Sequence, residues 1–236
     1  MATRYGMLID LRKCVGCEAC TVACKAENGV PLGHFRTRVE THESGTFPKV
    51  SMTFLPVLCN HCDAPACVEV CPTGASIKRE DSIVKVNQED CVGCTYCVTA
   101  CTYGARYLDE EKKVVDKCNF CVHRVEQGLV PSCVNTCVAD CRSFGDLNDP
   151  NTAISKAIKQ PGVVQIGNTS MYYRLPENFD RSMLPADYVG AAPLGVWQSL
   201  LQPAGKALLG GVVLATAASL VANTVKKDGK EGESHD

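Results

Sequence analysis

Closely spaced cysteines carry the clearest chemical signal in this chain. Between Cys91 and Cys101 their spacing is Cys-x2-Cys-x2-Cys-x3-Cys, which is typical of iron–sulfur ligation. Three thiolates so close together can bind three corners of one cubic cluster, and the fourth, one helical turn later, points away toward another cluster. One such run therefore implies a partner run elsewhere in the chain.

Three further cysteine runs precede and follow this one. The first repeats its spacing and its Val-Gly dipeptide, the second has a four-residue gap and ends in Pro72, and the last has an eleven-residue gap. Each run offers three near thiolates and one far thiolate, so we expect four clusters. In chain order, the sixteen candidate iron ligands are Cys14, Cys17, Cys20 and Cys24, then Cys59, Cys62, Cys67 and Cys71, then Cys91, Cys94, Cys97 and Cys101, and finally Cys118, Cys121, Cys133 and Cys137.

Disulfide bonds and zinc fit the cysteine pattern less well. The total of 17 cysteines is odd, no secretory signal peptide is recognisable, and the x2 spacing recurs in every run. Structural zinc normally takes four thiolates in two short pairs, which is fewer than the repeated runs supply. Cys141 is left over, and we expect it to be a buried free thiol rather than a competing ligand.

Short elements of an α+β fold are expected around these runs. Residues 5–11 predict an entry strand, residues 25–33 a loop and residues 46–58 an extended core segment. Residues 71–77 resemble residues 101–107, and each copy is followed by a polar turn and a short apolar strand. This internal repeat indicates two copies of a helix–hairpin unit, the half-module of a ferredoxin.

From residue 123 onward the sequence predicts only a few short elements and one long apolar segment. Residues 123–131 predict a loop and residues 144–150 a closing turn, and the segment 151–206 predicts a covering region with a short helix at 154–158 and strands at 163–166 and 171–175. Residues 207–225 contain no charged side chain. As a helix they would span about 28 Å, close to the thickness of a bilayer core, so we expect a transmembrane helix followed by a polar tail, 226–236.

The charges argue against one class of partner. The formal net charge is −2 and no basic run occurs in the first 200 residues, so nucleic-acid binding is not expected. Bound clusters would add negative charge, because iron and sulfide do not fully cancel four thiolates. His61 and His123 lie within or next to cysteine runs, and we expect them to be hydrogen-bond donors near clusters or surface residues; with Arg124 and Lys117, such groups could raise a cluster potential.

The order of the four runs gives a family resemblance. Residues 5–150 resemble the iron–sulfur subunit of the complex iron–sulfur molybdoenzymes, the dimethyl sulfoxide reductase superfamily, and are most similar to the polysulfide, thiosulfate, tetrathionate and arsenate reductase type. The apolar C-terminal segment is instead similar to the iron–sulfur subunits of formate dehydrogenases and hydrogenases. The segments that carry the resemblance are Leu11–Cys24, Cys59–Cys62, Cys71–Ala75, Cys118–Arg124 and Phe144–Pro150.

The resemblance implies two nested ferredoxin-like modules with two clusters each. The domain 1–150 would comprise an outer module, 1–58 plus 102–150, and an inner module, 59–101. Spacing alone would also allow the first run to pair with the second and the third with the fourth. The four ligand sets that the family implies are Cys14, Cys17, Cys20 and Cys137; Cys24, Cys118, Cys121 and Cys133; Cys59, Cys62, Cys67 and Cys101; and Cys71, Cys91, Cys94 and Cys97.

The expected function is electron transfer rather than catalysis. Four [4Fe–4S] clusters would pass electrons between a quinone- or haem-binding integral membrane subunit and a molybdopterin-containing catalytic subunit. The alternatives are a free polyferredoxin-like carrier, or a subunit of a hydrogenase or formate dehydrogenase. The lysines that follow residue 225 favour a cytoplasmic tail and a periplasmic cluster domain at the membrane. We see no residue set for substrate chemistry in the sequence.

Overall fold

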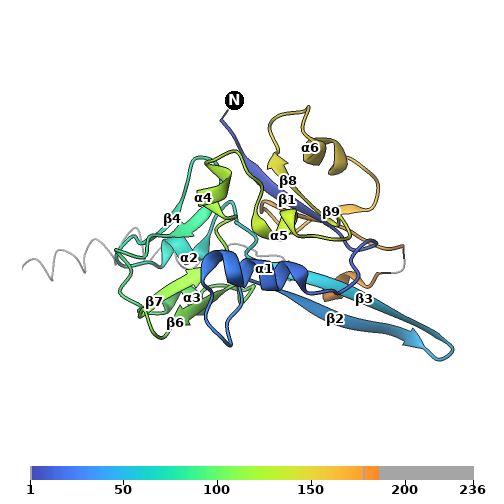
Figure 1. Ribbon diagram of the computed structural model, residues 1–236, viewed down its shortest axis with the longest axis horizontal. Coiled ribbons are helices and arrows are strands. Elements are labelled where there is room, and N and C mark those ends of the chain that lie inside the picture. The colour runs from blue at the N-terminus through green and yellow to red at the C-terminus, as the bar shows by residue number, and fades with distance from the viewer. Residues whose placement is uncertain (1, 178, 186–236) are drawn as a thin grey trace, which may run out of the picture. The chain divides into compact units, whose positions relative to one another are not determined.

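A four-stranded sheet joins residues 5–10 to residues 142–174 in the computed structural model, which describes residues 2–177 and 179–185 (Figure 1). Its strands lie in the order β8-β1-β10-β9, with β1 antiparallel to β8 and parallel to β10. The bounds are Tyr5–Asp10 for β1, Arg142–Asp146 for β8, Val163–Gln165 for β9 and Met171–Arg174 for β10, and helix α6, Ala153–Ala157, follows β8.

This sheet confirms the predicted entry strand and corrects two other predictions. The predicted turn at 144–150 is wrong at its start, because residues 142–146 form a strand that pairs with Tyr5–Ile9. The backbone groups of β1 need partners on both edges, and β8 supplies one set. The predicted covering strands exist, but β10 lies inside the sheet beside β1 rather than over it.

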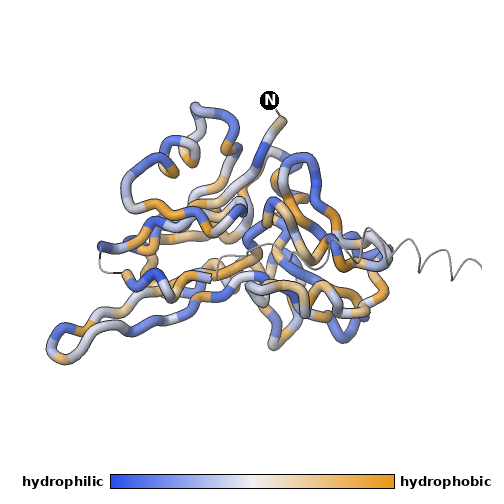
Figure 2. The backbone as a smooth tube through the Cα atoms, turned by 180° about the vertical axis from the view of Figure 1, so that it is seen from behind, coloured by the Kyte–Doolittle hydropathy of each residue, from blue (hydrophilic) through white to orange (hydrophobic). Residues whose placement is uncertain are grey.

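A long hairpin extends from this sheet region. Strands β2, Thr37–Thr46, and β3, Lys49–Leu58, pair along their whole lengths. Only the last four residues of β3 are buried, so the predicted core segment 46–58 is a strand of which the first half is exposed. In Figure 2 the far end of the hairpin has both hydrophilic and hydrophobic segments, and Phe47 at its tip is 92% exposed.

The internal repeat folds as predicted into two similar helix–hairpin units. In the first, α2, Ala66–Glu69, is followed by β4, Ser76–Lys78, and β5, Val84–Val86. In the second, α3, Tyr96–Thr99, is followed by β6, Arg106–Asp109, and β7, Val114–Lys117. Each hairpin is a separate two-stranded sheet, and α2 contacts α3, so the two copies lie together.

Three more helices carry or flank cysteines: α1, Ala19–Asn28, α4, Val122–Val125, and α5, Ser132–Asn135; a 3-10 turn, Arg181–Met183, follows β10. The predicted loop at 25–33 is wrong in its first part, because α1 continues to Asn28. Nothing breaks the helix before Gly29, which ends it in the left-handed conformation and donates its N–H to the Lys25 carbonyl oxygen. The predicted loop at 123–131 likewise begins inside α4.

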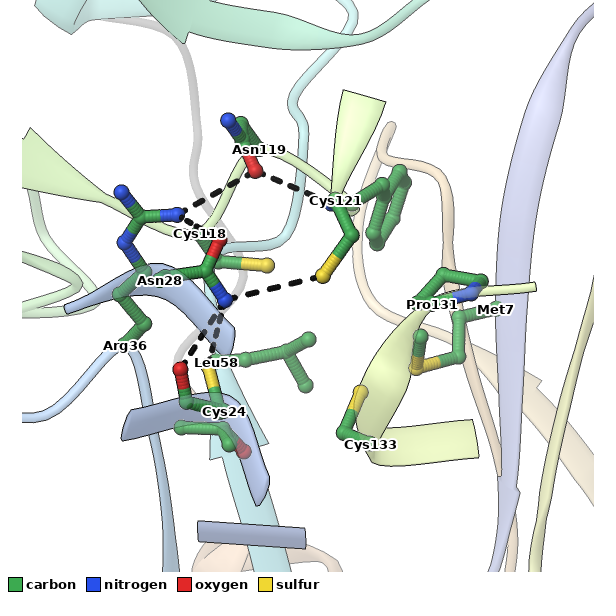
Figure 3. Close-up of a pocket in the computed structure, with 12 residues that line it drawn as sticks. Met7, Cys24, Asn28, Arg36, Leu58, Cys118, Asn119, Cys121, Pro131 and Cys133 are labelled. Carbon is green, nitrogen blue, oxygen red and sulfur yellow. Dashed lines mark hydrogen bonds between the residues drawn. The ribbon is translucent and has the colours of Figure 1, made fainter. Parts of the chain in front are cut away.

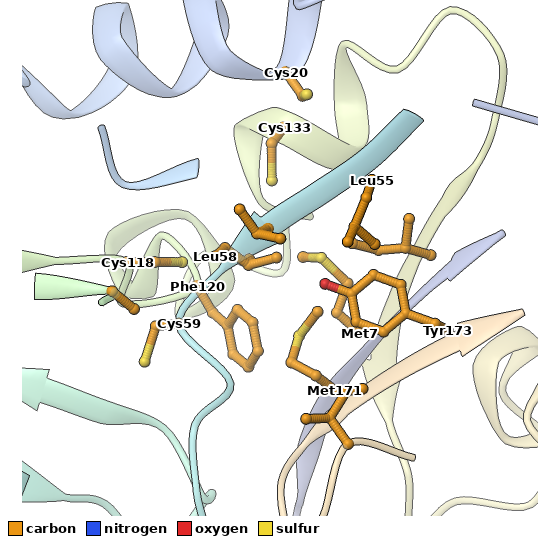
Figure 4. Close-up of a cluster of buried hydrophobic side chains, with 14 of the residues drawn as sticks. Met7, Cys20, Leu55, Leu58, Cys59, Cys118, Phe120, Cys133, Met171 and Tyr173 are labelled. Atoms are coloured by element: carbon orange, nitrogen blue, oxygen red, sulfur yellow. The ribbon is translucent and has the colours of Figure 1, made fainter. Parts of the chain in front are cut away.

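The main core lies where these elements meet (Figure 4). Met7, Met171 and Tyr173 from the sheet are fully buried against Leu55 of the hairpin. Tyr173 donates its hydroxyl to the Pro56 carbonyl oxygen at 2.8 Å, which satisfies a polar group that would otherwise be unpaired in the core. Cysteines border this core, namely Cys20, Cys59, Cys118 and Cys133. The elements therefore form the expected α+β fold, with thiols at the edge of its apolar interior.

The predicted transmembrane helix, 207–225, and the polar tail, 226–236, lie outside the described residues. Within residues 2–177 and 179–185, no helix combines the length and the apolar character that crossing a bilayer requires.

Candidate cluster-binding sites

Each cysteine run begins in a loop and continues into a short helix. In the first run, Cys20 and Cys24 lie four residues apart on α1, so they share one face of that helix. In each of the other runs a near thiol sits on a helix and the far thiol follows four residues later, just beyond the helix end. These pairs are Cys67 and Cys71, Cys97 and Cys101, and Cys133 and Cys137.

The first site brings the start of the chain to the end of the last run. Its thiols line one cavity, and Cys141 lines the same cavity. The backbone N–H of Cys141 donates to the Cys137 sulfur at 3.4 Å, and the two sulfurs are also 3.4 Å apart. The four predicted ligands found here are Cys14, Cys17, Cys20 and Cys137.

The second site lies between α1 and the last run, about a hundred residues apart in sequence (Figure 3). Asn28, one turn after Cys24, directs its side-chain amide toward the sulfurs of both Cys24 and Cys121, at 3.7 Å each. Arg36 holds this amide by donating to its oxygen at 2.7 Å. The four predicted ligands that line this cavity are Cys24, Cys118, Cys121 and Cys133.

The third site is built from the second run and the far thiol of the third. Cys62, Cys67 and Cys101 line one cavity. Cys59 is not part of that lining, but it lies close to Cys62. Burial is the main cause of the raised pKa of Cys62, and the neighbouring thiols Cys59, Cys67 and Cys101 add to it. The structure thus brings the four thiols of the third predicted set together.

The fourth predicted set lies in the two helix–hairpin units. The backbone N–H of Val115 donates to the Cys91 sulfur at 3.3 Å, and that of Ser76 to the Cys71 sulfur at 3.4 Å. Cys97 is buried on α3, next to α2, and Cys94 precedes that helix. In the described part of the chain, no three His, Cys, Asp or Glu side chains are close enough to share a single metal ion.

Burial opposes ionisation of the inner thiols. It raises the pKa of Cys24 and of Cys62 to about 12, and that of Cys67 to about 11, while neighbouring thiols add to the effect. Cys118 is buried, and its pKa lies well above the ordinary value for the same reasons. These thiols can act as thiolates only when positive charge enters the site, as the iron of a cluster would provide.

The far thiols Cys71 and Cys137 have a different environment. Burial would raise their pKa, but backbone N–H groups outweigh it, so that the pKa of each thiol is lowered. For Cys71 the donors include Ser76, and for Cys137 they include Cys141 and Arg142. These N–H groups stabilise a thiolate, the form that binds iron.

The four sites follow one another through the molecule. Thiols of neighbouring sites interact electrostatically: Cys20 with Cys133, from the first and second sites, and Cys118 with Cys59, from the second and third. At the next boundary Arg106 hydrogen-bonds Cys67 of the third site and interacts electrostatically with Cys97 of the fourth. The order along the path is therefore first, second, third, fourth.

The two histidines singled out in the sequence have different roles. His61 is fully buried and stacks on Phe120 with ring centroids 3.7 Å apart. Burial and the nearby Lys117 hold the pKa of His61 well below its ordinary value, and its Nδ1 accepts the Val84 N–H at 3.0 Å. The neutral ring thus packs between the second and last runs. His123 is half-exposed and faces Glu27 on the surface, at 2.8 Å.

Three buried cations lie beside these thiols, and of these the sequence pattern had pointed only to Lys117. Arg106 and Arg142 are about 5% and 4% exposed, each donates to a cysteine sulfur, and each retains an Nε–H without a partner. Lys117 is also buried and donates to two carbonyl oxygens. No carboxylate among the described residues pairs with any of the three. Because an unpaired buried cation is costly, an anionic cluster fits these sites.

Comparison with known proteins agrees with this chemistry. Two family models, both described as 4Fe–4S dicluster domains, match residues 13–75 and 50–147. Together with the sixteen cysteines in runs, two dicluster domains account for four [4Fe–4S] clusters, as predicted.

The chain is also similar to single subunits of several known reductases and dehydrogenases. It is 51% identical over 160 residues to a tetrathionate reductase subunit of Salmonella typhimurium, an alignment covering 66% of this chain and 64% of that protein. It is 44% identical over 186 residues to a sulfite dehydrogenase subunit of Allochromatium vinosum, covering 70% and 78%. It is also 44% identical over 161 residues to one polypeptide of the polysulfide reductase of Wolinella succinogenes, covering 67% and 84%.

Proposed function

Because this protein belongs to the family of iron–sulfur subunits of dimethyl sulfoxide reductase-type complexes, we propose that it relays single electrons inside such a complex. One partner would be a molybdopterin-containing catalytic subunit, and the other an integral membrane subunit that binds quinone or haem. The observation that carries the proposal is the row of four thiol sites, each next to the following one. Clusters exchange electrons without making bonds, so the chain's part is spacing and potential.

The proposed ligand sets are the four that the family implies, in the order of the sites described above. The shared cavities support the first and second sets, and the neighbouring thiols support the third. The nested modules, 1–58 plus 102–150 and 59–101, are supported by β1 pairing with β8 and by the contact of α1 with α5. When bound, each cluster would supply a one-electron centre, while the protein buries it and donates N–H groups to its thiolates.

Metal content and turnover test the relay. We expect the anaerobically purified chain to hold about sixteen iron atoms and as many acid-labile sulfides, four of each per cluster. It should be reduced by dithionite, yet it should not turn over tetrathionate, polysulfide, arsenate or selenate by itself. Elemental analysis, sulfide assay and substrate assays on one preparation would check this. Two to four zinc atoms with little iron, or turnover by the pure single chain, would contradict it.

We also propose attachment to a membrane through residues 207–225, with the cluster domain in the periplasm. The support is their uncharged sequence and the lysines after them, Lys226, Lys227 and Lys230. Protease added to intact spheroplasts should then cut the region 1–190 and spare the tail, as read by antibodies to each part. Protection of the cluster domain would reject the orientation, and release from the membrane by salt without detergent would reject the anchor.

A further inference from the structure

Three buried cations occupy the boundaries between consecutive thiol sites. They are Arg142, Lys117 and Arg106, each less than one-tenth exposed. As described above, no carboxylate among the described residues pairs with them, so their charges act undiminished on whatever lies close by. Thiols of the proposed ligand sets lie close by in all three cases.

Arg142 lies between the first and second sites. It donates from Nη2 to the Cys20 sulfur at 3.3 Å, and it interacts electrostatically with Cys133. The same nitrogen donates to the Thr37 hydroxyl at 3.1 Å, which fixes the guanidinium in the core. Cys20 and Cys133 belong to different proposed clusters, so one cation faces two consecutive members of the relay.

Lys117 lies between the second and third sites. Its ammonium donates to the carbonyl oxygens of Val84 and Cys118, which hold it in place without neutralising it. It interacts electrostatically with Cys118 of the second site and with Cys67 of the third. The middle boundary therefore also contains one cation.

Arg106 lies between the third and fourth sites. It donates from Nη2 to the Cys67 sulfur at 2.9 Å and interacts electrostatically with Cys97. Its other terminal nitrogen donates to the Ser76 hydroxyl at 2.6 Å. The arrangement repeats that of Arg142: a buried guanidinium, held by a hydroxyl, donates to a thiol of one site and interacts electrostatically with a thiol of the next.

The two arginines occupy equivalent positions in the cysteine runs. Arg106 follows the far thiol Cys101 by five residues, and Arg142 follows the far thiol Cys137 by five. Each donates to the third near thiol of the site that this far thiol completes, Cys67 and Cys20 respectively. A contact that recurs at equivalent positions argues for a shared role in the clusters rather than for an accident of packing.

We propose that Arg142, Lys117 and Arg106 are positioning residues of the relay, each placing one positive charge at the boundary between two consecutive clusters. Reduction adds negative charge to a cluster, and a nearby cation in a low-dielectric interior favours the reduced state. A cation that faces two clusters raises the potential of both and keeps the step between them small. This inference rests on the proposed ligand sets.

The test is a redox titration of the full chain followed by electron paramagnetic resonance. In Arg142→Met we expect the first and second clusters to become harder to reduce, each by about tenfold in its reduction equilibrium, which is 59 mV for one electron. The third and fourth clusters should be unchanged. In Arg106→Met the third and fourth clusters should become harder to reduce, while the first and second should be unchanged. Arg142→Lys should keep potentials close to those of the wild type, because lysine retains the positive charge. Signals are assigned with single Cys→Ser variants of each site.

Arg124→Met is the matched control: its place in the sequence suggested a role in tuning a cluster, but its charge is paired with Glu27 at 3.0 Å, so the variant should leave all four potentials in place. Unchanged potentials in both Met variants, or equal shifts of all four clusters, would overturn the inference. The inference would also be overturned if the first and second clusters of Arg142→Lys were as hard to reduce as those of Arg142→Met. Iron analysis of the same samples separates the outcomes: full iron with unmoved potentials rejects only the charge role, whereas a wild-type chain without clusters rejects the proposed function.

Discussion

Replacing Cys24 by serine is expected to perturb the cluster of the second site, or to remove it, while the first site keeps its full set of thiolates. Cys24 follows Cys20 on the same helix, yet its sulfur lies in the cavity of Cys118, Cys121 and Cys133. Asn28 faces the sulfurs of Cys24 and Cys121, so the loss of one thiol disturbs the whole site. Loss of the second cluster would leave a gap between the first and third clusters and interrupt electron transfer through the chain.

Iron analysis and electron paramagnetic resonance of Cys24→Ser check this. We expect about four iron atoms fewer than in the wild type, or about one fewer if a three-iron cluster persists, with the signal of the first site intact. Disturbance of the first site's signal instead would show that Cys24 and Cys14 share a cluster.

Cys141→Ala is the matched control, since this buried thiol borders the first cavity but is not a proposed ligand. The equivalent positions in the second and third runs, Ala75 and Ala105, are buried alanines, so the slot accepts a methyl group. The variant should keep about sixteen iron atoms. Loss of a cluster in Cys141→Ala would make Cys141 a ligand.

The cysteine spacing is enough to predict the number of clusters and the short helices, because these depend on contacts within a few residues. A near thiol on a helix and a far thiol four residues later follow from helical geometry, as in Cys67 and Cys71. The internal repeat likewise predicts both small hairpins, since each copy contains its own turn and strands. Local pattern and observed structure therefore agree in this part of the chain.

The long-range features could not be read from local pattern. The strand β8 forms because β1, more than 130 residues earlier, has an edge to fill, and nothing near Phe144 signals this. The sequence predicts a loop from residue 25 because Lys25 and Glu27 are polar. Both residues are nevertheless compatible with a helix, and α1 ends only at Gly29. The burial of Arg106 and Arg142 is equally hidden, since an arginine after a cysteine run is normally exposed.

Removing the carboxylate of Asp116 is expected to be the most costly single change outside the thiols. Arg36 donates to both oxygens of Asp116 at 2.8 Å, and the two side chains are only 9% and 11% exposed. Tyr107 donates its hydroxyl to the same carboxylate. Asp116→Ala would leave the guanidinium buried and uncompensated, which typically costs about 3–5 kcal/mol.

The effect should reach the second site, because Arg36 also holds the Asn28 amide that faces Cys24 and Cys121. Thermal loss of the cluster absorption under anaerobic conditions measures both consequences. At roughly 2–4 °C per kcal/mol for a chain of this size, the midpoint should fall by about 6–20 °C. The second cluster's signal should broaden or be lost before the others.

Two comparisons isolate the cause. Glu40→Gln removes the half-exposed pair with Arg38, worth about 0–1 kcal/mol, and should change the midpoint little. Adding Arg36→Met to Asp116→Ala removes the stranded charge, so the double variant should regain much of the lost stability. A double variant no more stable than Asp116→Ala alone would show that the carboxylate matters through Tyr107 or through packing, and that the charge of Arg36 is already balanced by the second cluster.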